Sequence, residues 1–588
     1  MENQSISRIH SRKTPGSRIP AGLLFLLLLV AAGTGMMIFI LWDKYSPNNS
    51  RVFPDFHGFD HPIYYRGQLL NMPALGSGES LKFPLPVIQD KIDSTAVYEQ
   101  ESDSVIITTQ DKVLRMRTDR LTAMLNEQPM KLSFPVEKTE GAVYLPMVPL
   151  KTYFQINWSE APDTGAVLLM KDGDVLQWGK ANLPENGKPQ QVPLRTHPTI
   201  RAPIVAELPN QGDVMIWKEV DDWYLVQLPN GITGYVPKTK LVLDRTEVIT
   251  ASDKSRPFIP WSPVGGKIVM SWEQVINKNP DTSQISDMPG LNVISPTWFH
   301  LERNQKGDYS IRNQADPAYV KWAHDQGYQV WALFSNSFDP DWTTEAIATY
   351  DSRMKLIRQL LAFAEMYDLQ GINIDFENVY VKDKAKLTQF VKEMTPLMHE
   401  QNLVVSIDVT VRGGSPNWSL FFDREALAKT VDYMIVMTYD EHWASSPDAG
   451  SVASLPWMEK GVADLIEHDH VPSNKLIMGI PFYTRLWTET VQQGKTPVKS
   501  KAVQMSYVQR VIREKKLQPK FDPATGQLYI EYPENGNTVK IWIEDEGSVQ
   551  SRMKLISKYD LAGVAAWKRG FETPEIWNVI ERTLQKRP

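Results

Sequence analysis

The chain has 588 residues, of which 42% are hydrophobic and 22% charged, so it is a globular protein too long for a single domain. Its net charge is −6 and it has no basic cluster outside the N-terminus, which argues against nucleic acid as a partner. The sequence has no cysteine, which excludes disulfides, thiolate nucleophiles and cysteine-ligated metals. Its 10 histidines form no metal-protease pattern, so we expect no metal and no cofactor.

The N-terminus carries the pattern of a membrane anchor. Residues 19–42 contain no charge and are long enough to span a hydrocarbon core of about 30 Å. The tail before them, residues 1–18, is rich in Arg and Lys, which orients it to the cytoplasm. The alternative is a cleaved signal peptide, whose apolar core normally ends after about 7–15 residues. Here the apolar run continues to Trp42, so we expect an uncut anchor with all later domains outside the membrane.

The next segments predict a tether and a small domain. Residues 43–64 are polar and punctuated by Pro and Gly, which is typical of a linker. Residues 65–180 contain short alternating segments, a short helix at 145–156 and a closing strand, which predicts an α+β module. This arrangement resembles the copper amine oxidase N-terminal-like domain of bacterial wall enzymes, although no copper ligands are evident.

Residues 190–245 predict a small all-β barrel. They contain five short β-type runs, Asn-Gln-Gly and Asn-Gly turns and no helical period. The placement of Trp217, Trp223 and Tyr235 resembles bacterial Src-homology-3-like domains, which implies binding of a cell-wall peptide. The alternative is that these aromatic residues only form the core of the barrel. Residues 246–263 follow as a second linker.

Residues 264–588 alternate between strands and helices. Eight β-type runs separated by helical stretches are the number required for a closed (β/α)₈ barrel, so the predicted fold class of the largest domain is α/β. A long gap at about 488–545 contains strand-like segments of its own, and we interpret it as an α+β insertion on the active-site face. The eight runs lie at 267–272, 291–299, 328–334, 371–377, 403–409, 433–439, 475–482 and 563–567.

The fourth run places acids among large apolar residues at a period of two. Asn373, Asp375 and Glu377 share one face of this strand, and the residues between them share the other. A half-exposed strand would show the same alternation, but Gly371 at its entry and the flanking helices favour an enclosed face. Two carboxylates one pleat apart, with Cα atoms about 7 Å from each other, perturb each other's ionisation.

Chemistry in such a barrel lies at the carboxyl ends of the strands. Polar and aromatic residues gather at those ends, among them the candidate catalytic residues Glu377, Asp375 and Tyr439, whose roles the resemblance described below implies. The candidate substrate-binding residues are Asn373, Asp440, Trp567, Trp298, Asn336, Asp408, Met437 and Arg485.

The sequence "QGINIDFE", together with "MTYD" and Trp567, resembles glycoside hydrolase family 18. The segments "GIPFY" and "LAGVAAW" are most similar to its cell-wall and spore-cortex lytic branch. The resemblance implies that Glu377 protonates the glycosidic oxygen and that Asp375 orients the substrate's N-acetamido group. It further implies that Tyr439 and Asp440 hold the carbonyl of that group and that Trp567 forms the floor beneath the sugar.

Two positions depart from the family motif Asp-Gly-x-Asp-x-Asp-x-Glu. Gln370 replaces the first Asp, at a position that we interpret as structural, and Asn373 replaces the second. An aspartate at this second position would share a proton with Asp375, whereas an amide only donates or accepts hydrogen bonds. The resemblance implies a retaining mechanism in which the sugar's own acetamido oxygen is the nucleophile.

The sequence thus predicts a membrane-anchored glycosidase that cleaves β-1,4 bonds next to N-acetylglucosamine in peptidoglycan or a related wall polymer. A second hypothesis is a catalytically silent wall-binding scaffold, supported by the accessory modules and the altered motif but opposed by Asp375, Glu377 and Tyr439 together. A third keeps the enzyme and changes the substrate to chitin or a glycoprotein glycan.

Overall fold

The computed structural model describes residues 21–139, 141–153, 155–183, 190–250, 258–263, 266–490 and 497–584. The predicted cytoplasmic tail 1–18 lies outside these residues, as do parts of the predicted second linker and of the predicted insertion. The chain forms two compact units. One runs up to Val87 and again from Met147 to Asp253, and the other contains Ile88–Pro146 and the chain from Lys254 onward.

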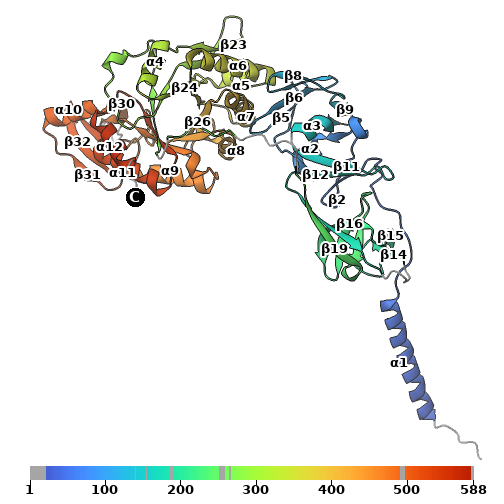
Figure 1. Cartoon of the computed structure of the whole chain (residues 1–588). Coiled ribbons are helices and arrows are strands. Elements are labelled where there is room, and N and C mark those ends of the chain that lie inside the picture. Colours follow the sequence, from blue (N-terminus) through green and yellow to red (C-terminus); the bar gives the residue numbers. More distant parts are fainter. Residues whose placement is uncertain are drawn as a thin grey trace, which may run out of the picture. The chain divides into compact units, whose positions relative to one another are not determined.

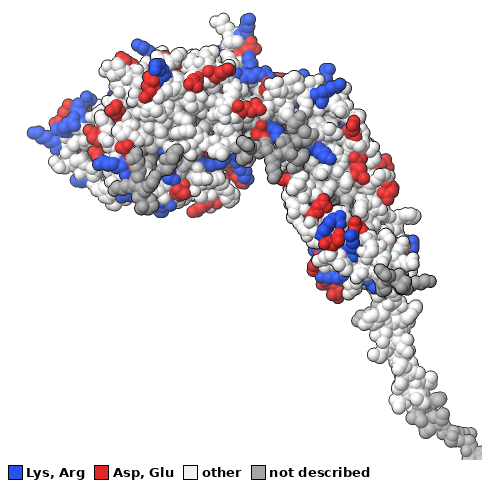
Figure 2. Space-filling model, in the orientation of Figure 1, with Lys and Arg blue, Asp and Glu red and all other residues white. Residues whose placement is uncertain are grey.

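Helix α1 (Ala21–Tyr45) covers most of the predicted anchor. Its segment Phe25–Trp42 has a mean hydropathy of 2.4, and none of it is buried against other described residues. The visible face of this segment is uncharged (Figure 2). Length and composition therefore allow it to cross a membrane, but a signal sequence at this position would have the same features.

The first unit also contains two β layers. One is a small mixed sheet with the strand order β11-β12-β1-β2. Along the chain, the short helix α2 follows β3 and the short helix α3 precedes β11. These elements, with strand β3 and the short helix η1, are β1 (Ile63–Tyr65), β2 (Gln68–Leu69), η1 (Gly78–Ser80), β3 (Lys82–Pro84), α2 (Leu85–Lys91), α3 (Met147–Tyr153), β11 (Ile156–Glu160) and β12 (Val167–Lys171).

The Src-homology-3-like segment lies within a seven-stranded sheet of order β15-β14-β18-β17-β16-β13-β19. Its core consists of alternate aliphatic side chains, including Val192, Leu194 and Val226. Trp217 is only partly buried and its indole N–H donates to Gln227 at 3.1 Å. The strands are β13 (Val175–Ala181), β14 (Gln191–Arg195), β15 (Ile204–Pro209), β16 (Asp213–Val220), β17 (Trp223–Gln227), β18 (Thr233–Pro237) and β19 (Leu241–Val248), with η2 (Lys238–Lys240) before the last.

The second unit begins with an antiparallel meander, which we call the lobe (residues 88–146). Its five strands follow one another in the order β4-β5-β6-β7-β8, and a further pair, β9 and β10, is antiparallel. The strands are β4 (Val97–Glu99), β5 (Ser104–Thr108), β6 (Val113–Arg117), β7 (Thr122–Leu125), β8 (Gln128–Lys131), β9 (Glu137–Thr139) and β10 (Ala142–Pro146).

The rest of this unit is a closed parallel barrel, which confirms the predicted fold class (Figure 1). Each of the eight predicted runs forms a barrel strand, and the last strand pairs with the first, at Ile268 and Gly563. The strands are β20 (Ile268–Glu273), β21 (Val293–Pro296), β24 (Gln329–Ser335), β25 (Gly371–Asp375), β26 (Val404–Thr410), β27 (Tyr433–Met437), β28 (Leu476–Pro481) and β34 (Gly563–Trp567).

Helices cover the outside of the barrel and begin at sequence-encoded caps. Thr349 and Ser352 form a capping box at α6, as Asp545 and Ser548 do at α11. The helices are α4 (Pro317–Asp325), α5 (Pro340–Ala346), α6 (Tyr350–Tyr367), α7 (Lys384–Glu400), α8 (Arg424–Thr430), α9 (Leu455–Glu467), α11 (Glu546–Lys558) and α12 (Glu575–Leu584), with the short helical turns η3 (Thr282–Gln284), η4 (Val381–Asp383), η5 (Pro416–Leu420) and η6 (Ser473–Lys475).

Two additions interrupt the barrel. A hairpin of β22 (Phe299–Arg303) and β23 (Tyr309–Asn313), which the sequence analysis did not predict, pairs with the end of β24. The predicted α+β insertion is present and begins at Tyr483, a few residues earlier than expected. It contains β29 (Tyr483–Glu489), β30 (Val498–Gln504), α10 (Met505–Lys515), β31 (Lys520–Asp522), β32 (Gln527–Glu534) and β33 (Asn537–Ile543).

Candidate active site

Strand β25 brings the two candidate catalytic acids to the carboxyl end of the barrel. Asp375 is its last residue, and Glu377 follows two positions later. The strand enters beside a large side chain: a Cβ on Gly371 would lie 2.8 Å from the Trp331 ring and 2.8 Å from the carbonyl oxygen of Val404. Glycine therefore allows β25 to pack between its neighbours, and the acids beyond it keep their position.

The carboxylates of Asp375 and Glu377 accept no hydrogen bond from the described residues. Both side chains are partly buried, and Oδ1 of Asp375 is inaccessible and without a partner. Burial without a hydrogen-bond donor disfavours a charged carboxylate. These carboxylates can therefore take up a proton or accept a hydrogen bond from a substrate.

Asn336 fixes the backbone of Glu377. Its amide donates to the carbonyl oxygen of Glu377 at 2.8 Å, and its own carbonyl accepts from the Glu377 N–H at 3.1 Å. Asn336 is itself fully buried and also donates to Thr343 at 2.9 Å. We therefore assign it a positioning role, whereas the sequence suggested contact with substrate.

The electrostatics of the site favour protonated acids. Burial raises the pKa of Asp375 to about 7. Burial also raises the pKa of Glu377 well above its ordinary value, and the charges of Asp375 and Asp440 raise it further. Because the acids interact, their protons come off as a coupled set, in which Glu377 retains a proton where an isolated glutamate would be ionised.

Asn373 lies inside the barrel, where all of its hydrogen-bonding capacity is used. Its amide donates to Asp408 Oδ1 at 2.9 Å and to the Ser406 hydroxyl at 3.1 Å. Its carbonyl accepts from Trp272 Nε1 at 3.0 Å and from the Ser295 hydroxyl at 3.3 Å. Asn373 therefore ties together four strands beneath the two acids and supports the site from below.

Asp408 is the third acid of this set. It is almost completely buried, and burial and the charge of Asp375 raise its pKa well above the ordinary range, against the opposing bond from Asn373. The sequence suggested contact with substrate for both Asp408 and Asn373. The structure pairs them with each other, which indicates an electrostatic and positioning role.

Aromatic side chains surround the acids. Tyr439 and Trp567 pack against the cluster inside the barrel, and both approach Trp272, with ring centres 6.4 Å and 5.8 Å away. Burial and the charge of Asp408 raise the pKa of Tyr439 well above its usual value, so its phenol remains a neutral donor. No described residue hydrogen-bonds its hydroxyl. Tyr439 and Trp567 therefore line the same end of the barrel as the two acids, and their contact with substrate stays a prediction.

The insertion reaches the site through Tyr483 and Arg485, which bind Asp440 just beyond β27. Asp440 has a φ of 60°, and its carboxylate accepts from the Tyr483 hydroxyl at 2.6 Å and from Arg485 at 3.0 Å. The Nε of Arg485 is buried and without a partner. The structure therefore joins Asp440 and Arg485, both predicted site residues, and adds Tyr483, which follows the "GIPF" segment and was not predicted.

Trp298 is not part of the site. It is fully buried, donates to Asn279 at 2.6 Å and packs on Tyr319 at 5.6 Å between ring centres. The reason is that β21 already ends at Pro296, so the chain has turned outward toward α4 before Trp298. Met437 ends β27 and is 8% exposed, so it contributes mainly to packing at this end of the strand.

Sequence reasoning missed Trp272, which lies near the end of β20. Its indole N–H donates to Asn373, and its ring contacts those of Tyr439 and Trp567. Its position in a predicted strand end was a usable signal. Among the described residues, no group of three or more His, Asp or Glu side chains could hold a metal ion.

Comparison with known proteins identifies three segments. The family model for glycosyl hydrolases family 18 matches residues 320–572, the bacterial SH3 domain matches 191–241, and the copper amine oxidase N-terminal domain matches 67–169. These matches confirm the three resemblances seen in the sequence.

Individual relatives agree with the family models. An uncharacterized glycosylase, YvbX, of Bacillus subtilis (strain 168) is 27% identical over 304 residues, which are 50% of this chain and 84% of that protein. The cortical fragment-lytic enzyme of Bacillus anthracis is 25% identical over 326 residues, 52% of this chain and 74% of the relative. The crystal structure of the spore cortex-lytic enzyme SleL of Bacillus megaterium QM B1551 is 19% identical, with a TM-score of 0.49, over 59% of this chain and 79% of that one. The chain therefore contains a domain of glycosyl hydrolase family 18 and is a glycoside hydrolase.

Proposed function

We propose that the enzyme cleaves β-1,4 bonds next to N-acetylglucosamine in peptidoglycan or a related wall polymer, with retention of configuration. The observation that carries this proposal is the isolated pair Asp375 and Glu377, two acids with raised pKa values and no hydrogen-bond donor among the described residues. A general acid needs a proton at working pH, and burial together with neighbouring charge provides it for Glu377.

In this mechanism Glu377 protonates the glycosidic oxygen as the bond to the leaving sugar breaks. Asp375 lies too close to Glu377 along the chain to attack from the opposite face of a sugar ring, so the nucleophile is the substrate's own acetamido oxygen. Asp375 then stabilises the positive charge that develops on the acetamido nitrogen. No hydrogen bond from a described residue occupies this carboxylate, which leaves it free to accept that N–H once the acetamido group is bound.

The hydroxyl of Tyr439 is the proposed donor to the acetamido carbonyl, since no described residue engages it. Asp440 already accepts bonds from Tyr483 and Arg485, so we propose that it positions this side of the site and contributes charge. Trp567 provides the apolar floor beneath the sugar ring. Water then opens the resulting oxazolinium ion, with Glu377 acting as the base.

The choice of a wall polymer rests on the relatives, several of which are cortical fragment-lytic enzymes. Other relatives are a probable chitinase of Drosophila melanogaster and an endochitinase of Brugia malayi, so chitin is the second candidate substrate. Digestion of purified sacculi and of chitin oligomers, with the products identified by mass, distinguishes the two. Cleavage of neither, with wall binding retained, would favour a silent scaffold.

The mechanism is tested by removing the proposed nucleophile from the substrate. We expect de-N-acetylated glycan to resist cleavage, because the acetamido oxygen is then absent. The measurement is the initial rate on acetylated and deacetylated forms of the same polymer. Equal rates would contradict substrate assistance while leaving glycosidic cleavage intact.

We further propose that α1 anchors the enzyme in the cell membrane and that the SH3 domain binds a cell-wall peptide. The uncharged span Phe25–Trp42 supports the anchor, and the match to residues 191–241 supports the peptide. Deleting residues 190–245 should weaken sedimentation with sacculi and leave turnover on short oligomers unchanged. Unchanged sedimentation would assign wall binding to another part of the chain.

A further inference from the structure

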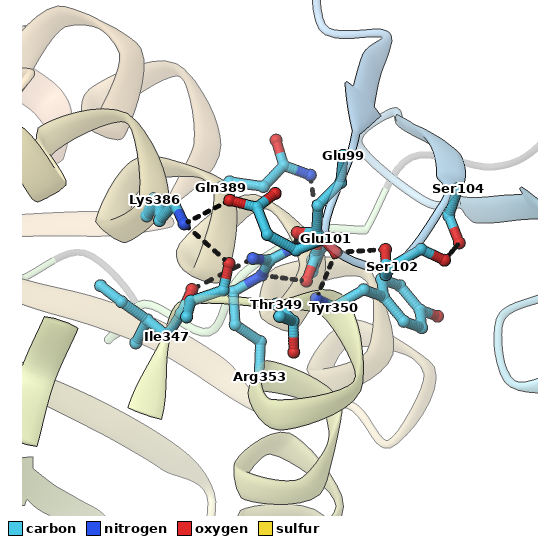
Figure 3. A network of polar contacts seen from close by, with 12 residues as sticks. Glu99, Glu101, Ser102, Ser104, Ile347, Thr349, Tyr350, Arg353, Lys386 and Gln389 are labelled. Carbon is cyan, nitrogen blue, oxygen red and sulfur yellow. Dashed lines mark hydrogen bonds and ion pairs between the residues drawn. The ribbon is translucent and has the colours of Figure 1, made fainter. Parts of the chain in front are cut away.

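The lobe is fixed to the barrel through buried charges (Figure 3). Arg353 of α6 donates to both carboxylate oxygens of Glu393 of α7, each at 2.8 Å, and its Nη2 lies 2.8 Å from Glu99 of the lobe. Glu99 also accepts the backbone N–H of Tyr350 at 2.7 Å. All three charged side chains are less than one-tenth exposed. Such a buried, multiply bonded group tolerates little displacement of the lobe.

Other contacts hold the lobe along the same helices. Arg115 of β6 forms a two-bond pair with Asp351, at 2.7 and 3.0 Å, and its guanidinium lies 4.4 Å from the centre of the Tyr350 ring. Asn126 of the lobe donates to Glu400 at the end of α7 at 2.6 Å. Several hydrogen bonds and ion pairs therefore join the lobe to helices α6 and α7.

A cavity of about 610 Å³ lies beside this junction. Its lobe side is formed by residues 93–95 and 108–110. Its barrel side is formed by α7, including Lys392, and by residues 423–430 at α8. This size matches that of pockets that bind small molecules. It lies on the outer surface of the barrel helices, away from the strand ends that carry Asp375 and Glu377.

The side chain of Thr108 indicates that a ligand completes this cavity. Thr108 is 4% exposed and lines the cavity, yet its hydroxyl has no hydrogen-bond partner. Its backbone carbonyl, by contrast, accepts from the Thr95 hydroxyl at 2.8 Å. A buried hydroxyl without a partner costs free energy in the empty protein. The hydroxyl oxygen is inaccessible in this rotamer, so a ligand in the cavity removes that cost when the Thr108 side chain rotates to meet it.

The charges around the cavity specify the class of ligand. Glu425 and Lys429 neutralise each other at 2.6 Å. Lys392 has no ion pair or hydrogen bond among the described residues. Among the described residues, Asp93 accepts only from Thr95, and Asp423 only from the N–H of Ala426. One ammonium and two carboxylates therefore lack an opposite charge among the described residues, and no described aromatic ring lines the cavity on which a sugar could stack.

We propose that this cavity binds a short peptide with a free carboxylate and a free amino group. Lys392 pairs with the carboxylate, Asp93 and Asp423 pair with the ammonium group, and the Thr108 hydroxyl bonds a peptide amide. The site is distinct from the proposed active site and does not depend on the reaction there. It gives the enzyme a means of recognising peptide next to the glycan that it cleaves.

The test is a calorimetric titration of the full chain, purified in a mild detergent, with the dipeptide alanyl-lysine. We expect binding by the natural protein, weaker binding by Lys392→Gln by at least about tenfold and a smaller loss in Thr108→Val. Thr108→Ser keeps the hydroxyl and should bind as the natural protein does. Lys355→Gln, an exposed lysine of α6, is the matched control and should also bind normally.

A second measurement separates the site from simple packing. Thermal unfolding of Thr108→Val without peptide should be unchanged or shifted upward, because the variant removes an unpartnered hydroxyl. The same dipeptide with acetylated and amidated ends should bind at least about tenfold more weakly. Absence of binding by the natural protein, or equal binding by Lys392→Gln, would overturn the proposal. Binding of a chitin trisaccharide that the same substitutions abolish would also overturn it.

Discussion

Three buried glutamates of the barrel unit differ in the charges of their neighbours. Glu393 and Glu544 are at most 1% exposed, and each faces an arginine, Arg353 and Arg552 respectively. Burial raises the pKa of both, and the arginine opposes that shift. At Glu377 burial is joined by the charges of Asp375 and Asp440, which act in the same direction. The partner therefore separates a structural glutamate from a proton donor, although burial is common to all.

The largest expected effect is on turnover. Glu377→Gln should lower kcat by about 10²–10⁴-fold, because the amide keeps the shape of the side chain and loses the transferable proton. Substrate binding should survive, which co-sedimentation with sacculi can measure. The matched control is Glu365→Gln on the exposed surface of α6, which should retain full activity. A loss below roughly tenfold at position 377 would remove Glu377 from the role of acid.

At the structural glutamates we expect a change in stability, because their role is to pair with a buried arginine. Arg353→Met leaves Glu393 and Glu99 buried without their counter-charge, so we expect a loss of about 3–5 kcal/mol in the unfolding free energy of the barrel unit. Urea unfolding followed by tryptophan fluorescence measures it. Arg358→Met, which breaks the more exposed pair with Glu127, is the control and should cost about 1 kcal/mol or less. Similar midpoints for the two variants would show that burial of the pair is not what stabilises the junction.

The sequence predicted the catalytic acids because their signal is local. A period of two, a strand end and a glycine at the strand entry are all visible within the segment 369–377. Gln370, interpreted as structural, does accept bonds from His324 and from the N–H of Val330. The eight barrel strands were found for the same reason, since each is a short apolar run between helices.

What the sequence did not reveal depends on distant partners. Glu99 and Tyr350 are 251 residues apart, so nothing in residues 65–180 indicates that part of this segment packs with the barrel. Trp567 is the last residue of its strand, whereas Trp298 lies two residues beyond the end of β21 and packs in the outer core. Asn336 was recognised as a site residue, but its bonds to the Glu377 backbone require the fold.

The raised pKa of Asp375 should also make the unfolding free energy depend on pH. The folded-state pKa of Asp375, about 7, lies above the unfolded value of about 3.9. A raised folded pKa stabilises the protein below the unfolded value, and that contribution is lost as pH rises from about 4 through 7. Asp375→Asn does not ionise, so its stability relative to the natural protein should increase by roughly 1–3 kcal/mol between pH 4 and pH 8. Urea unfolding of both proteins at pH 4 and pH 8 measures this difference in unfolding free energy. The same difference at both pH values would contradict the raised pKa.

The smallest expected effect concerns Asn373, where a neutral amide can be compared with a carboxylate at the same position. In the natural protein its amide donates to Asp408 at 2.9 Å, and its carbonyl accepts from Trp272 and Ser295. Asn373→Asp replaces the donor with an oxygen facing Asp408 and adds a carboxylate about 7 Å along the strand from Asp375. If the new group is charged, Asp375 ionises less readily, so the acidic limb of kcat/KM against pH should move upward by roughly one unit.

The stereochemistry of the product should not change, because the acetamido nucleophile belongs to the substrate. Asn474→Asp, at an exposed turn before β28, adds the same charge away from the acids and should leave the limb in place. The bonds from Trp272 and Ser295 favour the charged form of the introduced carboxylate over a proton shared with Asp408. Superimposable profiles of the natural protein and Asn373→Asp would therefore mean that the barrel floor is electrostatically separate from the acids above it, and that Asn373 serves only to hold the strands together.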